Sequence, residues 1–200
     1  MGGGDQSDYG TVFQITPSGA LTTLVSFGTN GAYPHAGLAW ATDGNFYGTT
    51  AFGGANAKGT AFQITPSGTL TTLYSFCAQT KCTDGANPYA ALVQATNGDF
   101  YGTTEYGGAA NVGVVSRLSA GLRPFVKTHP TAGQAGAAVQ ILGPNQTGAT
   151  SVMFNGTAAV FKVASSSLIT TTVPAGATTG TVQVVTPGRA LSNVPFRVLP

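Results

Sequence analysis

Hydrophobic and polar residues alternate along short stretches of this chain with a period of two. In the stretch 21–27, Leu21, Thr23 and Val25 alternate with Thr22, Leu24 and Ser26, so two hydrophobic side chains fall on one face and one on the other. This period places successive side chains on opposite faces of a strand, so it predicts β-strands rather than helices. Glycine and proline interrupt the stretches every few residues, and the pattern as a whole predicts an all-β protein.

The first 118 residues contain a repeat of about fifty residues. The segment 10–19, GTVFQITPSG, recurs as GTAFQITPSG at 59–68, an offset of 49 residues. The match continues in two further pairs of segments, LTTLVSF and LTTLYSF, then ATDGNFYGTTAFGG and ATNGDFYGTTEYGG. The expected organisation is two complete units at 10–58 and 59–112, a partial third unit at 113–118 and a trace of an earlier one at 2–4.

Each unit is expected to form four short strands. In the first unit these are TVFQIT, LTTLVSF, GLAWAT and FYGTT. The pairs Asp43-Gly44 and Asn97-Gly98 predict two-residue hairpin turns of type I′, which need positive φ at both central residues. Four strands per unit at this period are typical of a β-propeller blade.

The repeat resembles the GloVer tandem repeat of bacterial secreted and surface-anchored proteins. This resemblance covers residues 1 to about 118 and implies a propeller-like array outside the cytoplasm. A closed propeller has about four to eight blades, so two blades and their stubs form an incomplete one. Open sheet edges can pair with another chain. The alternatives are a fragment of a longer protein, completion by oligomerisation, and a small sandwich of the two units.

A different pattern follows a linker at 119–122. Residues 123–200 hold about seven strand-like stretches with Gly, Pro and Asn turns, among them AAVQILG, TSVMFNG, AAVFKVAS, LITTTVP, GTVQVVTP and VPFRVLP. Several short strands of this kind predict an immunoglobulin-like sandwich. The segment also resembles the IPT/TIG domain in GPNQTGATSVMFNG, in VPAGATTG and in a final FRV. In bacterial surface proteins, this resemblance implies a spacer or interaction module.

Composition narrows the function classes. Charged residues make up 7% of the chain, 8 basic and 6 acidic, against about 25% in an ordinary domain. No apolar run approaches the roughly 20 residues of a membrane helix, so no membrane span is expected. A net charge of +2 is too small to indicate nucleic-acid binding. All six acids lie within 1–118, so an ion site is to be sought there.

Cys77 and Cys82 lie in the insertion that lengthens the second unit. A disulfide between them is expected if the backbone doubles back, and free thiols or a metal pair are the alternatives. A disulfide indicates an extracytoplasmic protein. The first ten residues, MGGGDQSDYG, show no signal peptide pattern, so either export uses another route or the chain begins inside a longer protein.

The candidates for chemistry are few. Asp43, Asp99 and His35 are the catalytic candidates, although a hairpin turn accounts for Asp43 and loop packing for His35. Asp43, Asp84, Asp99 and Glu105 offer oxygen ligands for calcium if their loops converge. A calcium-dependent hydrolase of lactones or esters, on a propeller completed by oligomerisation, is the enzyme hypothesis. No other cofactor is expected.

Aromatic residues suggest a binding surface. Trp40, Tyr47, Tyr101 and Tyr106 are the candidates for stacking on a glycan, with core packing as the alternative. The function expected from the sequence is a non-catalytic, extracytoplasmic scaffold, adhesion or binding module. The hydrolase and a carbohydrate-binding module are the alternatives. The expected partners are further copies or other repeat-bearing chains at the sheet edges, and a glycan or cell-surface partner.

Overall fold

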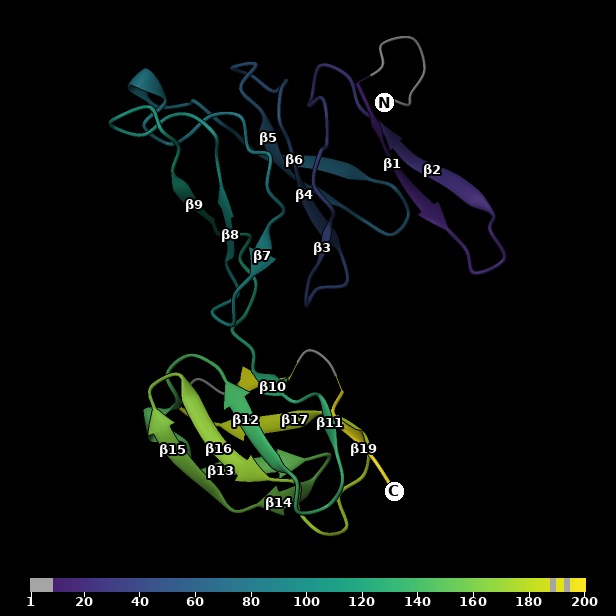
Figure 1. Ribbon diagram of the computed structural model, residues 1–200, viewed down its shortest axis with the longest axis vertical. Coiled ribbons are helices and arrows are strands. Elements are labelled where there is room, and N and C mark those ends of the chain that lie inside the picture. The colour runs from purple at the N-terminus through teal and green to yellow at the C-terminus, as the bar shows by residue number, and fades with distance from the viewer. Residues whose placement is uncertain (1–8, 188–189, 193–194) are drawn as a thin grey trace. The chain divides into compact units, whose positions relative to one another are not determined.

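The chain is almost entirely β in the computed structural model, which describes residues 9–187, 190–192 and 195–200. The described residues form nineteen strands and two short 3₁₀ turns (Figure 1), so the all-β prediction is confirmed. Two compact units are distinguished: the repeat module, Met1–Gln94 with Asp99–Ala120, and the C-terminal module, Ala95–Gly98 with Gly121–Pro200. The trace of a repeat expected at 2–4 and the first residue of the strand expected at 194–200 lie outside the described residues.

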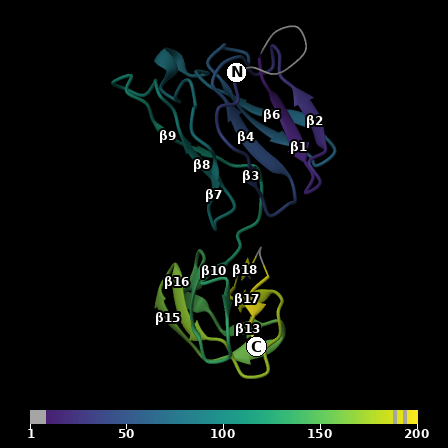
Figure 2. The same cartoon turned by 45° about the vertical axis from the view of Figure 1, so that its right-hand side comes forward.

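The repeat module holds three antiparallel sheets. Figures 1 and 2 show them following one another side by side in chain order. The first is the hairpin of β1 (Thr11–Ile15) and β2 (Leu21–Ser26). The second has four strands, β3 (Ala39–Trp40), β4 (Phe46–Thr50), β5 (Thr60–Ile64) and β6 (Leu70–Ser75). The third has three strands, β7 (Val93–Gln94), β8 (Phe100–Thr103) and β9 (Val115–Leu118).

The sheets do not coincide with the repeat units. The expected division into two four-stranded sheets, one for each unit, is corrected by the pairing of β4 with β5, which joins the end of one unit to the start of the next. The four-stranded sheet therefore takes half of its strands from each unit. The reason is that a tandem repeat specifies a period but no starting point, and every choice of phase gives the same sequence pattern.

The turn between β3 and β4 also differs from the expected type I′. Only Gly44 has a positive φ, +80°, and its N–H donates to the Ala41 carbonyl at 3.0 Å. The Asn45 carbonyl in turn accepts from the Ala41 N–H at 3.0 Å. This is the longer hairpin loop, in which a tight turn is followed by a glycine in the left-handed region. Asp43 is thereby free of backbone strain and keeps its carboxylate for side-chain bonds.

Neighbouring sheets of the repeat module meet at two interfaces. The first interface, between the β1–β2 hairpin and the four-stranded sheet, is an apolar cluster of Val12, Phe27, Phe62 and Ile64. The Phe27 and Phe62 rings meet edge to face at 5.2 Å. The second interface, between the four-stranded and the three-stranded sheet, is joined by a stacked ring pair and by hydrogen bonds across the gap.

The C-terminal module has two four-stranded sheets and a short parallel pair. One sheet has the strand order β10 (Lys127–His129), β12 (Ala138–Leu142), β16 (Leu168–Thr172), β15 (Phe161–Ser165). The other has the order β14 (Thr157–Ala159), β13 (Ser151–Phe154), β17 (Val182–Val185), β18 (Ala190–Leu191). The parallel pair is β11 (Ala132–Gly133) with β19 (Arg197–Val198). Inward residues of both sheets share one core, in which Phe154 and Phe196 meet edge to face at 5.1 Å.

Candidate functional site

Asp43 is held by hydrogen bonds within its own sheet. Its Oδ2 accepts from Asn45 Nδ2 at 2.7 Å, from the Tyr47 hydroxyl at 2.9 Å and from Gln63 Nε2 at 3.3 Å. Burial by itself would raise the pKa of Asp43, but the hydrogen bonds from Asn45 and Tyr47 outweigh it and lower the pKa. Burial and the Asp43 carboxylate raise the pKa of Tyr47 to about 12. The carboxylate therefore anchors a turn to two strands.

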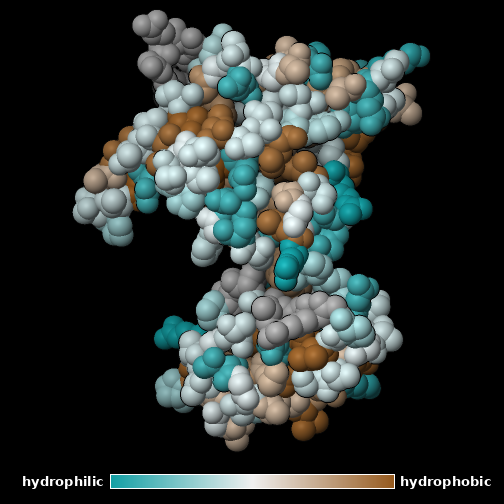
Figure 3. Space-filling model, turned by 180° about the vertical axis from the view of Figure 1, so that it is seen from behind, coloured by the Kyte–Doolittle hydropathy of each residue, from teal (hydrophilic) through white to brown (hydrophobic). Residues whose placement is uncertain are grey.

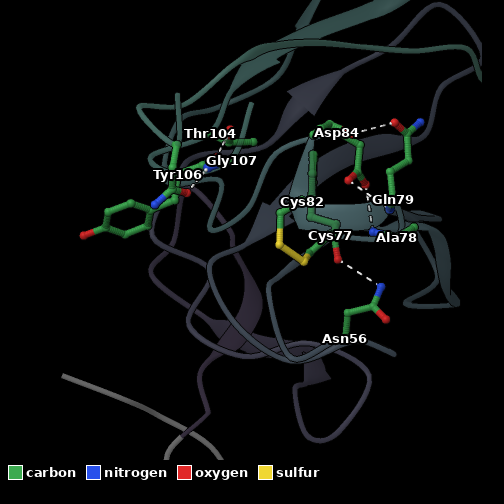
Figure 4. Close-up of a disulfide and its surroundings, with 12 residues drawn as sticks. Asn56, Cys77, Ala78, Gln79, Cys82, Asp84, Thr104, Tyr106 and Gly107 are labelled. Atoms are coloured by element: carbon green, nitrogen blue, oxygen red, sulfur yellow. Dashed lines mark hydrogen bonds between the residues drawn. A yellow bond between two sulfur atoms is a disulfide. The ribbon is translucent and has the colours of Figure 1, made fainter. Parts of the chain in front are cut away.

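Asp84 organises the cysteine insertion (Figure 4). Its carboxylate accepts from the Tyr74 hydroxyl at 2.6 Å, and from the N–H groups of Ala78 and Gln79 at 2.9 and 3.1 Å. The structure joins Cys77 to Cys82 by a disulfide at the base of the same loop. Burial raises the pKa of Tyr74 to about 12, helped by the carboxylate. The three donors lower the pKa of Asp84 against the opposing effect of burial.

The other two candidate calcium ligands, Asp99 and Glu105, lie on either side of β8. Asp99 precedes β8, is buried, and accepts a 2.7 Å hydrogen bond from Arg117 Nε on β9. The repeat relates this pair to Asn45 and Gln63 of the four-stranded sheet, which lie 54 residues earlier. Glu105 follows β8, and its carboxylate raises the pKa of the neighbouring Tyr106 hydroxyl. Within the described ranges, no three His, Cys, Asp or Glu side chains are close enough to hold a metal ion together. The four acids proposed as calcium ligands therefore do not form such a group in the described part of this chain.

The aromatic candidates have different environments. Trp40 on β3 is 70% exposed, and Tyr106 is also exposed. Tyr47 is 1% exposed because its ring is stacked in the second interface and its hydroxyl is bound to Asp43. Tyr47 is therefore not part of a surface for ligands, and core packing explains it. Tyr101 is partly buried on β8.

A group of rings that the sequence reasoning did not bring together lies on the surface of the repeat module. Tyr33, His35, Tyr89 and Phe52 form a cycle of ring contacts, here called the aromatic face. The centroid distances around the cycle are 6.3, 5.1, 6.4 and 5.7 Å. Its three larger rings are each about 40% exposed. Tyr9 extends the group through an edge contact with Tyr33 at 6.2 Å.

Backbone geometry places these rings together. Tyr33 has φ +58°, a left-handed conformation that is unusual for a tyrosine. The N–H groups of Ala32 and Phe52 each donate to the carbonyl of the other, at 2.8 and 3.0 Å. These bonds bring the loop before β3 against the segment after β4. Tyr89 comes from the second unit, so the aromatic face is formed across the repeat boundary.

A shallow depression adjoins the aromatic face at Tyr89. It is lined by Tyr89, Ala90, Thr103, Thr104 and Glu105, and has a volume of about 480 Å³. Rings, hydroxyls and one carboxylate thus lie beside one another. The sequence signal for this site was the alignment of His35 with Tyr89, two ring-bearing residues that each follow a proline. That signal did not show that the two loops touch.

Comparison with known families identifies the repeat. The model of the Gloeobacter/Verrucomicrobia repeat matches residues 1–148. The chain belongs to this family. The match includes every residue of the aromatic face and of both interfaces. A comparison with curated proteins gave no match.

The disulfide between Cys77 and Cys82 is a feature typical of proteins in oxidising compartments. Among the residues that the structure describes, no helix is long and apolar enough to cross a membrane.

Proposed function

We propose that this member of the Gloeobacter/Verrucomicrobia repeat family is a non-catalytic binding module that contacts carbohydrate through the aromatic face. The observation that carries the proposal is the exposed cycle of Tyr33, His35, Tyr89 and Phe52. A contiguous exposed apolar patch with a polar rim marks an interaction site. Aromatic rings with polar tips suit a partner that is itself both apolar and polar.

The surroundings of the rings favour a sugar over a purely apolar ligand. Glu105 in the adjoining depression supplies a carboxylate, which accepts hydrogen bonds from hydroxyl groups. Thr103 and Thr104 add hydroxyls that donate or accept. A pyranose has a weakly apolar face of C–H groups, which would lie on the aromatic rings. Its hydroxyl groups would then reach the threonines and the carboxylate of the depression.

Affinity electrophoresis of the full chain against a panel of soluble glycans tests the proposal. Retardation by at least one glycan is expected, together with its loss in Tyr33→Ala and Tyr89→Ala. Trp40→Ala is the matched control, because Trp40 is the most exposed aromatic ring described but makes none of these ring contacts. Absence of retardation on the panel, or an equal loss in the control, would refute the aromatic face as the site.

A second candidate function, assembly with further copies, rests on the strand edges. Within the described residues β5 pairs on both sides, whereas β1 pairs only with β2 and β9 only with β8. Side chains on these strands include the exposed Phe13, Ile15 and Val115. On the face that Figure 3 draws, hydrophobic residues form patches on the repeat module. Unpaired edges with exposed apolar residues favour pairing with another chain.

Light scattering of the full chain over a hundredfold range of concentration tests assembly. A mass above that of the 20.0 kDa monomer is expected, and it should fall in Phe13→Lys and Val115→Lys because edge lysines oppose strand pairing. Monomer at every concentration would refute it. Assembly of this kind would complete a propeller-like array from the incomplete set of sheets.

We further propose that the C-terminal module is an immunoglobulin-like sandwich of IPT/TIG type that serves as a spacer or interaction module. Its two sheets and their common core support this assignment. The disulfide supports a location outside the cytoplasm, secreted or on the cell surface.

A further inference from the structure

The second interface of the repeat module contains a cavity, partly open to solvent, where the first interface is filled. Its volume is about 430 Å³, within the range of roughly 300–1,000 Å³ typical of small-molecule sites. Ala61, Tyr74 and Phe76 line it from the four-stranded sheet and its C-terminal end. Gly102, Ser116 and Leu118 line it from the three-stranded sheet.

The repeat explains why this space is open. In the four-stranded sheet, Gly48 pairs across strands with Phe62, and a Cβ added to Gly48 would lie 2.6 Å from the Phe62 ring. Gly48 therefore accommodates the ring. In the three-stranded sheet the corresponding cross-strand pair is Gly102 with Ser116. The glycine is kept but the phenyl ring is replaced by a hydroxymethyl group.

The wall of the cavity on the four-stranded sheet also carries a smaller side chain than its counterpart in the first interface. Val12, one of the residues packed around Phe62 in the first interface, corresponds to Ala61 in the second. A register shift follows Val12 in β1 and Ala61 in β5, which supports the correspondence. The cavity thus lies where the apolar cluster of the first interface would be. Relative to the first interface, the second lacks the ring that Phe62 supplies, because Ser116 stands at the corresponding position.

Ser116 brings an unpartnered hydroxyl to the lining of this cavity. Its Oγ is buried and has no hydrogen-bond partner among the described residues. Asp84, at the wall, already accepts from Tyr74, Ala78 and Gln79. The Arg117 guanidinium is paired with Asp99. Because Asp84 already accepts three hydrogen bonds within the chain and Arg117 is paired with Asp99, we expect the cavity to favour a neutral ligand over an ion.

We propose that the cavity binds a small neutral aromatic compound of the phenol class. The ring takes the place that Phe62 occupies in the first interface, and its hydroxyl hydrogen-bonds Ser116 Oγ. Apolar protein cavities of ring size bind benzene, and the unpartnered hydroxyl adds preference for a phenol. None of the four rings of the aromatic face lines this cavity, although Thr103 and Thr104 line both the cavity and the depression beside those rings.

The test is a titration of the full, uniformly ¹⁵N-labelled chain with phenol and, separately, with benzene, followed by amide chemical shifts. Saturable shifts centred on Gly102, Ser116 and Phe76 are expected with both compounds. Ser116→Phe should weaken phenol binding at least tenfold because its ring fills the site. Ala61→Val copies the first interface with a smaller change, and should also weaken binding if Ser116→Phe fails to fold. Trp40→Ala is the control and should bind phenol as the wild type does.

Ser116→Ala separates the ring from the hydroxyl. Phenol affinity should fall about two- to tenfold, the range for one neutral hydrogen bond, while benzene affinity stays unchanged. Three results would each overturn the proposal. The wild type could show no saturable shifts, the shifts could centre on the aromatic face, or the variants that fill the cavity could bind phenol as well as the wild type does. Glycan retardation of Ser116→Phe should equal that of wild type, so the two proposed sites can fail separately.

Discussion

The ring of Tyr47 stacks on the ring of Phe100, with centroids 4.1 Å apart and planes inclined by 27°. Tyr47 belongs to the four-stranded sheet and Phe100 to the three-stranded sheet, and both are fully buried. Around this pair, Gln94 exchanges two hydrogen bonds with Thr42, at 3.0 and 3.1 Å. The stack is thus the apolar centre of an interface that otherwise contains hydrogen bonds and a cavity.

Phe100→Ala should lower the free energy of unfolding of the repeat module by about 3–5 kcal/mol, the usual cost of removing a buried ring. Tyr47→Phe keeps the ring and removes the hydroxyl that donates to Asp43, so a smaller loss of about 1–3 kcal/mol is expected. Urea unfolding measured by tyrosine fluorescence and circular dichroism checks both values. Equal losses in the two variants would contradict the assignment of the main effect to stacking.

Ser116→Phe and Phe62→Ser should change stability in opposite directions, although they exchange corresponding residues. Filling the cavity at Ser116 should raise the free energy of unfolding by about 0.5–2 kcal/mol. Removing the ring at Phe62 should lower it by about 3–5 kcal/mol. Thermal melts of the two variants and the wild type check this prediction, with a higher melting temperature expected for Ser116→Phe and a lower one for Phe62→Ser. A destabilised Ser116→Phe would mean that the cavity is too narrow for a phenyl ring.

Asn87 combines a backbone requirement with a side-chain bond. It has φ +55°, and its Nδ2 donates to the Ala51 carbonyl at 2.9 Å. Asn87→Gly keeps the permitted φ and loses the bond, at a cost of about 1 kcal/mol. Asn87→Ala loses the bond and adds backbone strain of about 1–2 kcal/mol. The order of stability in urea should be wild type, then glycine, then alanine, and a reversed order of the two variants would count against left-handed strain.

Acid should destabilise the repeat module through Asp43 and Asp84. Both carboxyls have folded-state pKa values below the ordinary 3.8. A lowered folded pKa means that the charged form stabilises the fold above that ordinary value, and the contribution is lost as pH falls through the folded pKa. The melting temperature should therefore decline below about pH 4. Asp43→Asn should melt lower than wild type at pH 7 but decline less in acid, and an unchanged acid slope would contradict this account.

Opening the disulfide between Cys77 and Cys82 should cost about 2 kcal/mol, as expected for a loop closed over a separation of 5 residues. The double variant Cys77→Ser, Cys82→Ser and the wild type in reductant should show the same loss in urea. The Asp84 bonds to Ala78 and Gln79 stay available, so the loop keeps its local turn. If reductant leaves the stability of the wild type unchanged while the double variant is destabilised, the loss comes from the introduced serines and not from the open disulfide.

The alternating pattern and the glycine-rich turns determined that the chain is all-β, since side-chain period and turn chemistry are local properties. The near identity of LTTLVSF and LTTLYSF determined the repeat and its period, and with it the family. The same local logic explains Asp43, whose bonds to Asn45 and Tyr47 lie within one hairpin.

Tertiary structure alone decided the rest, because it depends on contacts between residues far apart in the chain. The phase of the sheets came from the pairing of β4 with β5, which a periodic sequence leaves open. The burial of Tyr47 came from a ring 53 positions later, and the exposed ring cycle came from three segments of two units. The cavity follows from the sequence and the tertiary structure together. The sequence places Ser116 where the preceding repeat has Phe62, and the packing between the sheets shows that nothing else in the described chain fills the space.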